Sequence, residues 1–464
     1  MYSSSSPYAR NLARRRETTI GKPVVGDVRR FFPCDRDGDS IIDHVSELHR
    51  AKVAPPATAD SPRGRSGPFR ALQHRDFRLL WFGLIGSAIG TWMQIVAQAL
   101  LVLDISHGSA FALGAVALSQ SLAFFAFSLF GGAVADRVDK RRLLLTTQSV
   151  CMALAALLGV LTAMHVVQVW MVVGLSFLQG AALSFDQPTR AALVPELVPK
   201  DELLNALSLQ SIVFTGSSTI GPALAGLSMA AIGYAGNFFA NALSYVAVLA
   251  ALLAIRPHAA GGPPRTPNPR AIQEALAAVR SDAVLPWLLA VYGALLFLGP
   301  SPALLLPVMG LQVLHLDAVR LGILFAASGV GTVFGGLGLA SLGDPRRKAR
   351  IVLGGAILWS LALAGFAASR SFASSLVALL VLGVSQVGVA ATTITLLQTR
   401  VPRSMSGRVM SLNTLLIMGV RPLGDFAAAA VIARAGAPFT AVASAVLVAS
   451  IAIAVALRPV VRDA

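Results

Sequence analysis

The sequence predicts an all-α membrane protein whose twelve transmembrane helices form two six-helix bundles. Composition is the first reason, because 55% of the 464 residues are hydrophobic and only 13% are charged, whereas soluble domains carry about 25% charged residues. The second reason is a series of apolar stretches of membrane-spanning length that begins at residue 79. The third is an internal duplication, since one segment of each half matches the other without gaps.

The apolar stretches define the predicted spans. A helix needs roughly 20 predominantly apolar residues to cross the hydrocarbon core of a bilayer. The twelve spans, in chain order, are 79–103, 111–135, 143–165, 168–190, 207–231, 235–256, 285–308, 319–341, 350–368, 374–396, 409–432 and 436–457.

Basic residues gather in every second connection between these spans. Five such connections are basic, and one basic residue from each, in chain order, is Lys140, Arg190, Arg265, Arg347 and Arg408. The alternate connections hold three basic residues, Arg320, Arg370 and Arg434. Because cytoplasmic loops are enriched in Lys and Arg, we predict a multi-pass protein of the bacterial inner membrane with both termini in the cytoplasm. The net charge of +16 then reflects topology, and no nucleic-acid partner is expected.

Composition divides the chain into five regions. The first is predicted to be a disordered, basic cytoplasmic tail, because it is polar and lacks apolar periodicity. In the linker, Ile272, Leu276 and Val279 recur at helical spacing and predict a short interfacial helix. The regions are the tail 1–76, the N-terminal bundle 77–256, the cytoplasmic linker 257–284, the C-terminal bundle 285–458 and the cytoplasmic C-terminus 459–464. Cys34 and Cys151 predict neither a disulfide nor a metal site.

The duplication relates residues 198–233 to residues 401–436 at a constant offset of 203 positions. Six spans separate the copies, so the halves form a parallel repeat about an axis along the membrane normal. Matched glycines allow close helix contact in lipid. We therefore expect the fifth and eleventh helices to lie at the interface between the halves, although plain packing is the alternative. The interface candidates are Gly221, Pro222, Gly226 and Gly424.

A second motif, G-G-A-V-A-D-R-V-D-K-R-R at Gly131 to Arg142, lies between the second and third spans. Through this motif the sequence resembles the major facilitator superfamily. The resemblance implies that Asp136 faces the start of the eleventh helix, at 406–408, and steadies one access state. Asp139 stands where the family most often has Gly. A purely topological role is the alternative to gating, and the gating candidates are Gly132, Asp136, Arg137, Lys140 and Arg141.

Further segments are similar to the enterobactin exporter group of that superfamily. They are G-T-W-M-Q-I-V-A-Q at 90–98, F-D-Q-P-T-R at 185–190, G-P-A-L-A-G at 221–226 and N-A-L-S at 241–244. The resemblance spans about residues 69–458 and implies a secondary exporter driven by the proton gradient, whose relatives handle siderophores, macrolides and other amphipathic molecules. It implies no cofactor. The group often has Arg where this chain has Ser218, and the duplicated position holds Arg421 instead.

Arg421 and Asp425 are the charged residues that lie clearly inside a predicted span. Intramembrane charges are costly and usually face a cavity, so we predict a substrate and proton-coupling site there. At spacing i, i+4 the two side chains can pair. Our hypothesis is that ionised Asp425 holds Arg421, and that a proton from outside frees Arg421 to change its grip on an anionic substrate. A self-neutralising structural pair is the alternative.

Uncharged polar residues extend this candidate site. Gln94 and Gln98 share a face of the first helix with Trp92 close by, so they are predicted to line a cavity. Amides in lipid also join helices by hydrogen bonds, which is the structural alternative. Asp186 and Arg190 form another i, i+4 pair, interpreted as a gate or a surface pair at the inner end of the fourth helix. Other amides within the spans are Gln120, Gln179, Gln210, Asn241, Gln386 and Asn413.

Three functions are compatible with these features to different degrees. The first is proton-coupled export, by alternating access, of a small amphipathic molecule such as a siderophore or a drug. The second is import of a nutrient or iron chelate by the same fold. A membrane enzyme or regulator is disfavoured, because the sequence has no His cluster, nucleophile elbow or phosphate-binding Gly loop. The expected partners are a small-molecule substrate, protons and the bilayer, and the protein is expected to be monomeric.

Overall fold

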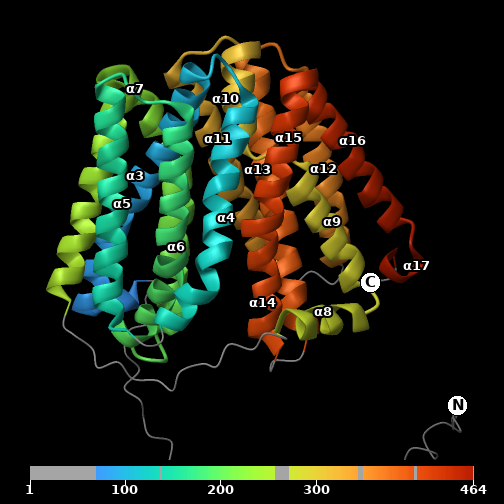
Figure 1. Cartoon of the computed structure of the whole chain (residues 1–464). Coiled ribbons are helices and arrows are strands. Elements are labelled where there is room, and N and C mark those ends of the chain that lie inside the picture. The colour runs from blue at the N-terminus through green and yellow to red at the C-terminus, as the bar shows by residue number, and fades with distance from the viewer. Residues whose placement is uncertain (1–68, 136–137, 256–270, 343–347, 402–404, 463–464) are drawn as a thin grey trace, which may run out of the picture. The chain divides into compact units, whose positions relative to one another are not determined.

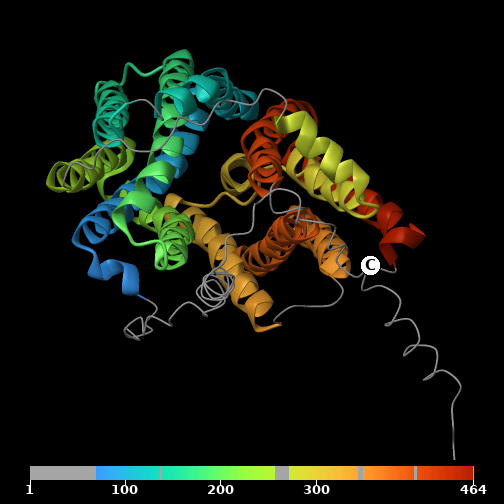
Figure 2. The ribbon, with the colours of Figure 1, turned by 90° about the horizontal axis from the view of Figure 1, so that it is seen from below.

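The computed structural model describes residues 69–135, 138–255, 271–342, 348–401 and 405–462. Helices dominate this part of the chain, and it contains no strand. The helices of the two halves form two groups, blue to green and yellow to red in Figure 1, and Figure 2 shows the same groups from below. The predicted arrangement of the spans in two six-helix bundles is therefore confirmed.

The N-terminal half begins with a short 3₁₀ turn, η2, and continues with five long helices. Their bounds are η2 Arg70–Gln73, α3 Arg75–Ile105, α4 Ala110–Ala135, α5 Lys140–Ala163, α6 Val169–Leu197 and α7 Leu203–Ala254. Within this half α3 and α5 pack against α7, and α4 and α5 pack against α6. Just before α3, the Ala71 N–H of η2 donates to Asn205 Oδ1 at 2.9 Å, which ties η2 to α7.

The 52-residue helix α7 contains two spans. Its backbone leaves helical geometry at Gly233, with φ 65° and ψ −171°, a region that favours glycine because it has no Cβ. Gly436, its duplicate, has φ 86° at the junction of α15 and α16. In the described residues, 11 helices are long and apolar enough to cross a membrane, and dividing α7 at Gly233 gives the twelve predicted spans.

The C-terminal half contains shorter pieces in addition to long helices. Its elements are α8 Ala271–Ser281, α9 Leu285–Leu298, α10 Pro302–Val308, η3 Met309–Val313, α11 Ala318–Ser341, α12 Lys348–Ala368, α13 Phe372–Arg400, α14 Ser406–Leu415, η5 Leu416–Val420, α15 Arg421–Ala435, α16 Ala437–Ala456 and α17 Pro459–Arg462. The linker helix α8 packs against α14, and Asp282, just after it, pairs with Arg400 at 3.5 Å. Both η3 and η5 are single π-helical turns.

The span predicted at 285–308 as one continuous helix is interrupted. It consists of α9 and α10, separated by Gly299, Pro300 and Ser301. Proline has no N–H to donate and restricts the residue before it, so Pro300 ends the first helix, and Pro302, at the first position of α10, begins the second. This break leaves the backbone N–H of Ser301 free to bind a side chain.

The two halves meet along two seams of small residues. In one, α4 packs on α15, where a Cβ on Gly114 would lie 2.5 Å from Ala429 Cβ. In the other, α7 packs on α11, where a Cβ on Gly226 would lie 2.5 Å from the Ala318 carbonyl oxygen. Nearby, Gln312 Nε2 donates to the Gly108 carbonyl at 2.7 Å. These contacts lie toward the end of the bundle opposite the basic connections.

Candidate functional site

A cavity of about 700 Å³ lies between the halves. Its walls come from α3, α4, α6 and α7 on one side and from α10, α11, α13, η5 and α15 on the other. Most of its surface is apolar, with Trp92, Phe124, Phe325 and Met418 among the lining side chains. Ligand pockets of about 300–1,000 Å³ that combine apolar walls with a few polar groups are typical of small-molecule sites.

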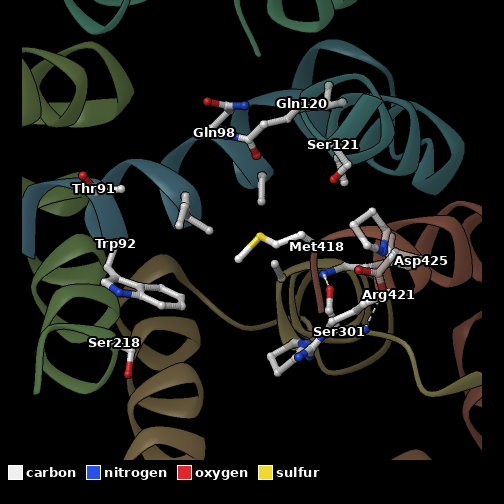
Figure 3. A pocket seen from close by; sticks show the side chains of 18 of the residues that line it. Thr91, Trp92, Gln98, Gln120, Ser121, Ser218, Ser301, Met418, Arg421 and Asp425 are labelled. Atoms are coloured by element: carbon white, nitrogen blue, oxygen red, sulfur yellow. Dashed lines mark hydrogen bonds between the residues drawn. The ribbon is translucent and has the colours of Figure 1, made fainter. Parts of the chain in front are cut away.

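Arg421 and Asp425 both line this cavity, at the start of α15 (Figure 3). The carboxylate of Asp425 accepts a hydrogen bond from the Ser301 backbone N–H at 2.7 Å. Asp425 is 6% exposed. The break in the seventh span supplies this donor, as discontinuous helices do at the binding sites of other transporters.

The direct ion pair expected between Arg421 and Asp425 is not formed. In the described part of the chain, Arg421 makes no hydrogen bond and no ion pair within 4.0 Å, although its charge still acts on the nearby Asp425 carboxylate. The π turn of η5 immediately precedes it and changes the direction in which the residues around it face, and such turns are frequent at functional sites. Both residues lie in the α-helix α15, so the i, i+4 spacing holds; the sequence did not show that the backbone of Ser301 already binds Asp425.

Gln94 and Gln98 line the cavity, but their amides are bonded within the N-terminal half. Asn241 Nδ2 donates to Gln94 Oε1 at 2.6 Å. Gln94 Nε2 donates to Gln98 Oε1 at 3.4 Å, and Gln98 Nε2 donates to Ser176 Oγ at 3.0 Å. This chain of amides joins α3, α6 and α7, so these contacts are of the kind in which amides hold helices together by hydrogen bonds.

Four other glutamines of the lining have amides that bond to no described residue. They are Gln120, Gln179, Gln187 and Gln386. On α6 the cavity stripe is Gln179, Leu183 and Gln187, at the i, i+4, i+8 spacing of one helix face. From this spacing, Gln187 could have been predicted from the sequence as a cavity residue on the same face as Gln179. The sequence alone did not show which amides have partners, because those partners come from other helices.

Trp92 and Ser218 also face the cavity (Figure 3). The Trp92 ring packs edge-on against Phe214, with 6.0 Å between centroids. Ser218 Oγ donates to the Thr215 carbonyl at 2.8 Å. Because Ser218 and its duplicate Arg421 line the same cavity from opposite halves, both charges of the described lining belong to the C-terminal half.

The interface candidates divide between two kinds of contact. Gly226 lies at the seam between α7 and α11, and Pro222 lines the cavity and contacts Gly322 through its carbonyl. Gly221 and Gly424 instead pack inside their own halves. A Cβ on Gly221 would lie 2.5 Å from Trp92 Cβ, and one on Gly424 would lie 2.1 Å from the Phe297 carbonyl oxygen. The duplication therefore preserves a contact within each half.

The loop motif fastens helices of the N-terminal half at the basic end. Lys140 pairs with Glu196 at 2.7 Å. Arg141 Nε donates to the Leu252 carbonyl at 2.6 Å, so it binds the carboxyl end of α7. Asp139 accepts from the Arg142 N–H at 2.9 Å and caps α5, a role that a Gly side chain could not perform.

The remaining gating candidates are Asp136, Arg137 and Gly132. Asp136 and Arg137 lie outside the described residues, as do the side chains of 406–408, so the expected approach of Asp136 to the start of α14 is not described. Gly132 belongs to α4.

Asp186 and Arg190 form an ion pair, but not at the surface. The Asp186 side chain is only 2% exposed, whereas that of Arg190 is 32% exposed. Gln148 Nε2 and Thr147 Oγ1 also donate to Asp186 Oδ1, at 2.6 and 3.1 Å. The carboxylate thus joins α5 to α6 inside the N-terminal half, next to the cavity residue Gln187.

Comparison with known proteins agrees with this architecture. Residues 66–463 match the family model described as transmembrane secretion effector. The chain is 26% identical over 381 residues to the enterobactin exporter EntS of Citrobacter koseri, covering 80% of this chain and 85% of that protein. It is 31% identical over 166 residues to the staphyloferrin A transporter of Staphylococcus aureus, covering 35% of this chain and 42% of that protein.

Solved structures share the fold. A bacterial homologue of the iron transporter ferroportin, in an inward-facing state, superposes with a TM-score of 0.64 at 17% identity, covering 83% of this chain and 99% of that chain. The nucleoside transporter NupG superposes with a TM-score of 0.66 at 12% identity, covering 82% and 98%. Together, the twelve spans, the cavity between duplicated halves and the family match show that the chain belongs to the transmembrane secretion effector family of major facilitator superfamily membrane transporters.

Proposed function

We propose that the protein exports a small amphipathic molecule across the bacterial inner membrane in exchange for protons. The basic connections and both termini face the cytoplasm, because Lys and Arg mark cytoplasmic loops. The proton gradient is the energy source, no cofactor takes part, and the monomer is the working unit. A siderophore is the proposed substrate, since relatives carry the names enterobactin exporter and staphyloferrin A transporter.

One observation carries the coupling mechanism: Asp425 is a buried carboxylate that lines the cavity and accepts a hydrogen bond from the Ser301 backbone N–H. A hydroxyl or amide N–H of the substrate can donate to the ionised carboxylate. A proton entering from outside occupies the same oxygen and removes that acceptor. Substrate and proton then compete for Asp425, and this competition is what exchange requires.

The seams between the halves support alternating access. Small residues at Gly114, Gly226 and Gly322 let helices of opposite halves approach within van der Waals distance toward one end of the bundle. Two bundles in contact mainly along such seams can tilt as rigid bodies about the central cavity. The loop motif, with Lys140 and Arg141 fastening the N-terminal half, keeps that half rigid during the movement.

A specific observation favours a second candidate, import of an anion together with protons. Arg421 makes no direct ion pair with a described residue, so its guanidinium can bind an acidic group of the substrate. Protonation of Asp425 removes a negative charge near that group, so anion and proton bind more tightly together than separately. Their binding is then cooperative, as uptake by proton cotransport requires.

Substrate binding as a function of pH separates the two candidates. With purified protein in nanodiscs and enterobactin as the probe, exchange predicts that binding weakens as pH falls, because the proton displaces the substrate. Anion cotransport predicts the opposite slope. Asp425→Asn removes the titrating group and makes binding independent of pH in either case.

The control variant is Asp201→Asn, whose carboxylate is 67% exposed outside the cavity and should leave the pH profile unchanged. Wild-type binding that does not vary with pH would refute coupling through Asp425. Proton-driven efflux from inverted vesicles then tests the direction of transport.

A further inference from the structure

The polar groups of the cavity fall into two classes, those bonded to the protein and those left available. Gln94, Gln98 and Asn241 form a chain of hydrogen-bonded amides that ends at Ser176. Gln120, Gln179 and Gln187 face the same cavity and bond to no described residue. All three belong to α4 and α6, opposite the charged residues of α15 (Figure 3 labels Gln120 and Arg421).

The charge of the lining limits the substrate further. Among the described lining residues, Arg421 and Asp425 are the charged ones, and their formal charges cancel. A substrate with several charges of one sign would enter an apolar cavity without matching counter-charges, which is costly. The cavity therefore favours a molecule that has little net charge.

The available amides also disfavour a purely apolar substrate. Each glutamine amide offers two N–H donors and one carbonyl acceptor. A bound molecule displaces the water that satisfies these groups, so a molecule without polar groups would leave them unbonded. Between these limits, Trp92, Phe124 and Phe325 provide surfaces for aromatic rings.

We infer that Gln120, Gln179 and Gln187 determine substrate specificity, and that the substrate is a weakly charged, amphipathic compound rich in hydroxyl and amide groups. This inference deepens the proposed function and rests on it. Hydroxyls and amides of the substrate bind the amide wall on α4 and α6, while one donor or acidic group reaches Asp425 or Arg421. Hydrophobic drugs without such groups are poor substrates.

Matched probe pairs test the inference. Each pair is a hydroxylated amide and its fully O-methylated ether, which keeps the carbon skeleton but loses the hydroxyl donors and gains one methyl group per hydroxyl. Enterobactin and its hexamethyl ether are one pair, and a monomeric catechol amide and a hydroxamate with their ethers are two more. Binding to the purified protein in nanodiscs is measured by calorimetry. For at least one pair, the parent should bind about tenfold more tightly than its ether.

The variants Gln120→Leu, Gln179→Leu and Gln187→Leu should each reduce that ratio severalfold without changing how the ether binds. Gln210→Leu is the control, since Gln210 lies on α7 outside the lining. Gln94→Leu should lower thermal stability because it breaks the bonded amide chain. Circular dichroism of each variant confirms that it is folded.

Three results would overturn the inference: ethers that bind as tightly as parents in every pair, parents that all fail to bind, or glutamine variants that keep the wild-type ratio. Failure of the proposed function gives a different result. Parents would still be selected over ethers, but Asp425→Asn would leave proton-linked binding and transport unchanged.

Discussion

At the residue scale, tertiary partners decide what each polar side chain can do. Asp425 and Asp186 are both buried carboxylates on spanning helices. Asp425 faces the cavity and has one backbone donor, whereas Asp186 is surrounded by Gln148, Thr147 and Arg190. The first can still accept a proton or a substrate donor. The second is already satisfied, so its contribution is to hold α5 and α6 together.

Replacing Asp186 by Ala should therefore lower stability. The change removes the carboxylate to which Gln148, Thr147 and Arg190 all donate. Gln148 and Thr147 remain buried but lose this acceptor. Hydrogen bonds to charged groups contribute about 1.5–3 kcal/mol each in soluble proteins, and about 0.6 kcal/mol on average between membrane helices, so we expect a loss of about 2 kcal/mol. Thermal denaturation in detergent measures it. Asp201→Ala, at an exposed site, should shift the midpoint little, and equal shifts for the two variants would contradict the buried role.

At the element scale, helices of the two halves approach at glycines. Gly216 and Gly226 lie on the same helix, α7, and differ in surroundings. A Cβ on Gly216 would meet nothing within 4 Å, whereas one on Gly226 would lie 2.5 Å from the Ala318 carbonyl oxygen and 3.2 Å from Gly322 Cα. Both sites would gain helix propensity from alanine, but only one has room for it.

Gly216→Ala should leave stability unchanged or raise it by up to about 1 kcal/mol, which is the helix-propensity difference. Gly226→Ala should destabilise the protein by about 1–3 kcal/mol, the cost of overpacking a close contact. Thermal denaturation compares them under one condition. Similar changes at both positions would show that α7 and α11 do not pack closely at Gly226.

At the scale of the whole molecule, two duplicated bundles of spans enclose one cavity. The topology follows from counting spans, because an even number brings both termini to the same side. In a variant in which Cys34 and Cys151 are both replaced by Ser, a single introduced cysteine shows on which side of the membrane its loop lies. We expect a membrane-impermeant maleimide to label His165→Cys in intact cells, and Asp201→Cys only after permeabilisation. Labelling of Asp201→Cys in intact cells would reverse the orientation.

Much of the fold was determined by the sequence itself. Lipid requires that spanning segments satisfy their own backbone hydrogen bonds, so length and hydropathy located the spans. The offset of 203 residues showed the duplication, and it extends to the positive φ of Gly233 and Gly436. Arg421 and Asp425 were predicted as cavity residues because charges are rare within spans, and both line the cavity.

Tertiary structure alone decided how these residues are partnered. The break at Ser301 supplies the donor to Asp425, a π turn precedes Arg421, and neighbouring helices bond Gln94 and Gln98 while leaving Gln120, Gln179 and Gln187 available. Hydropathy and periodicity describe a segment and its faces. Which side chains bond across helices depends on how segments distant in the chain pack together, and local sequence patterns do not show that packing.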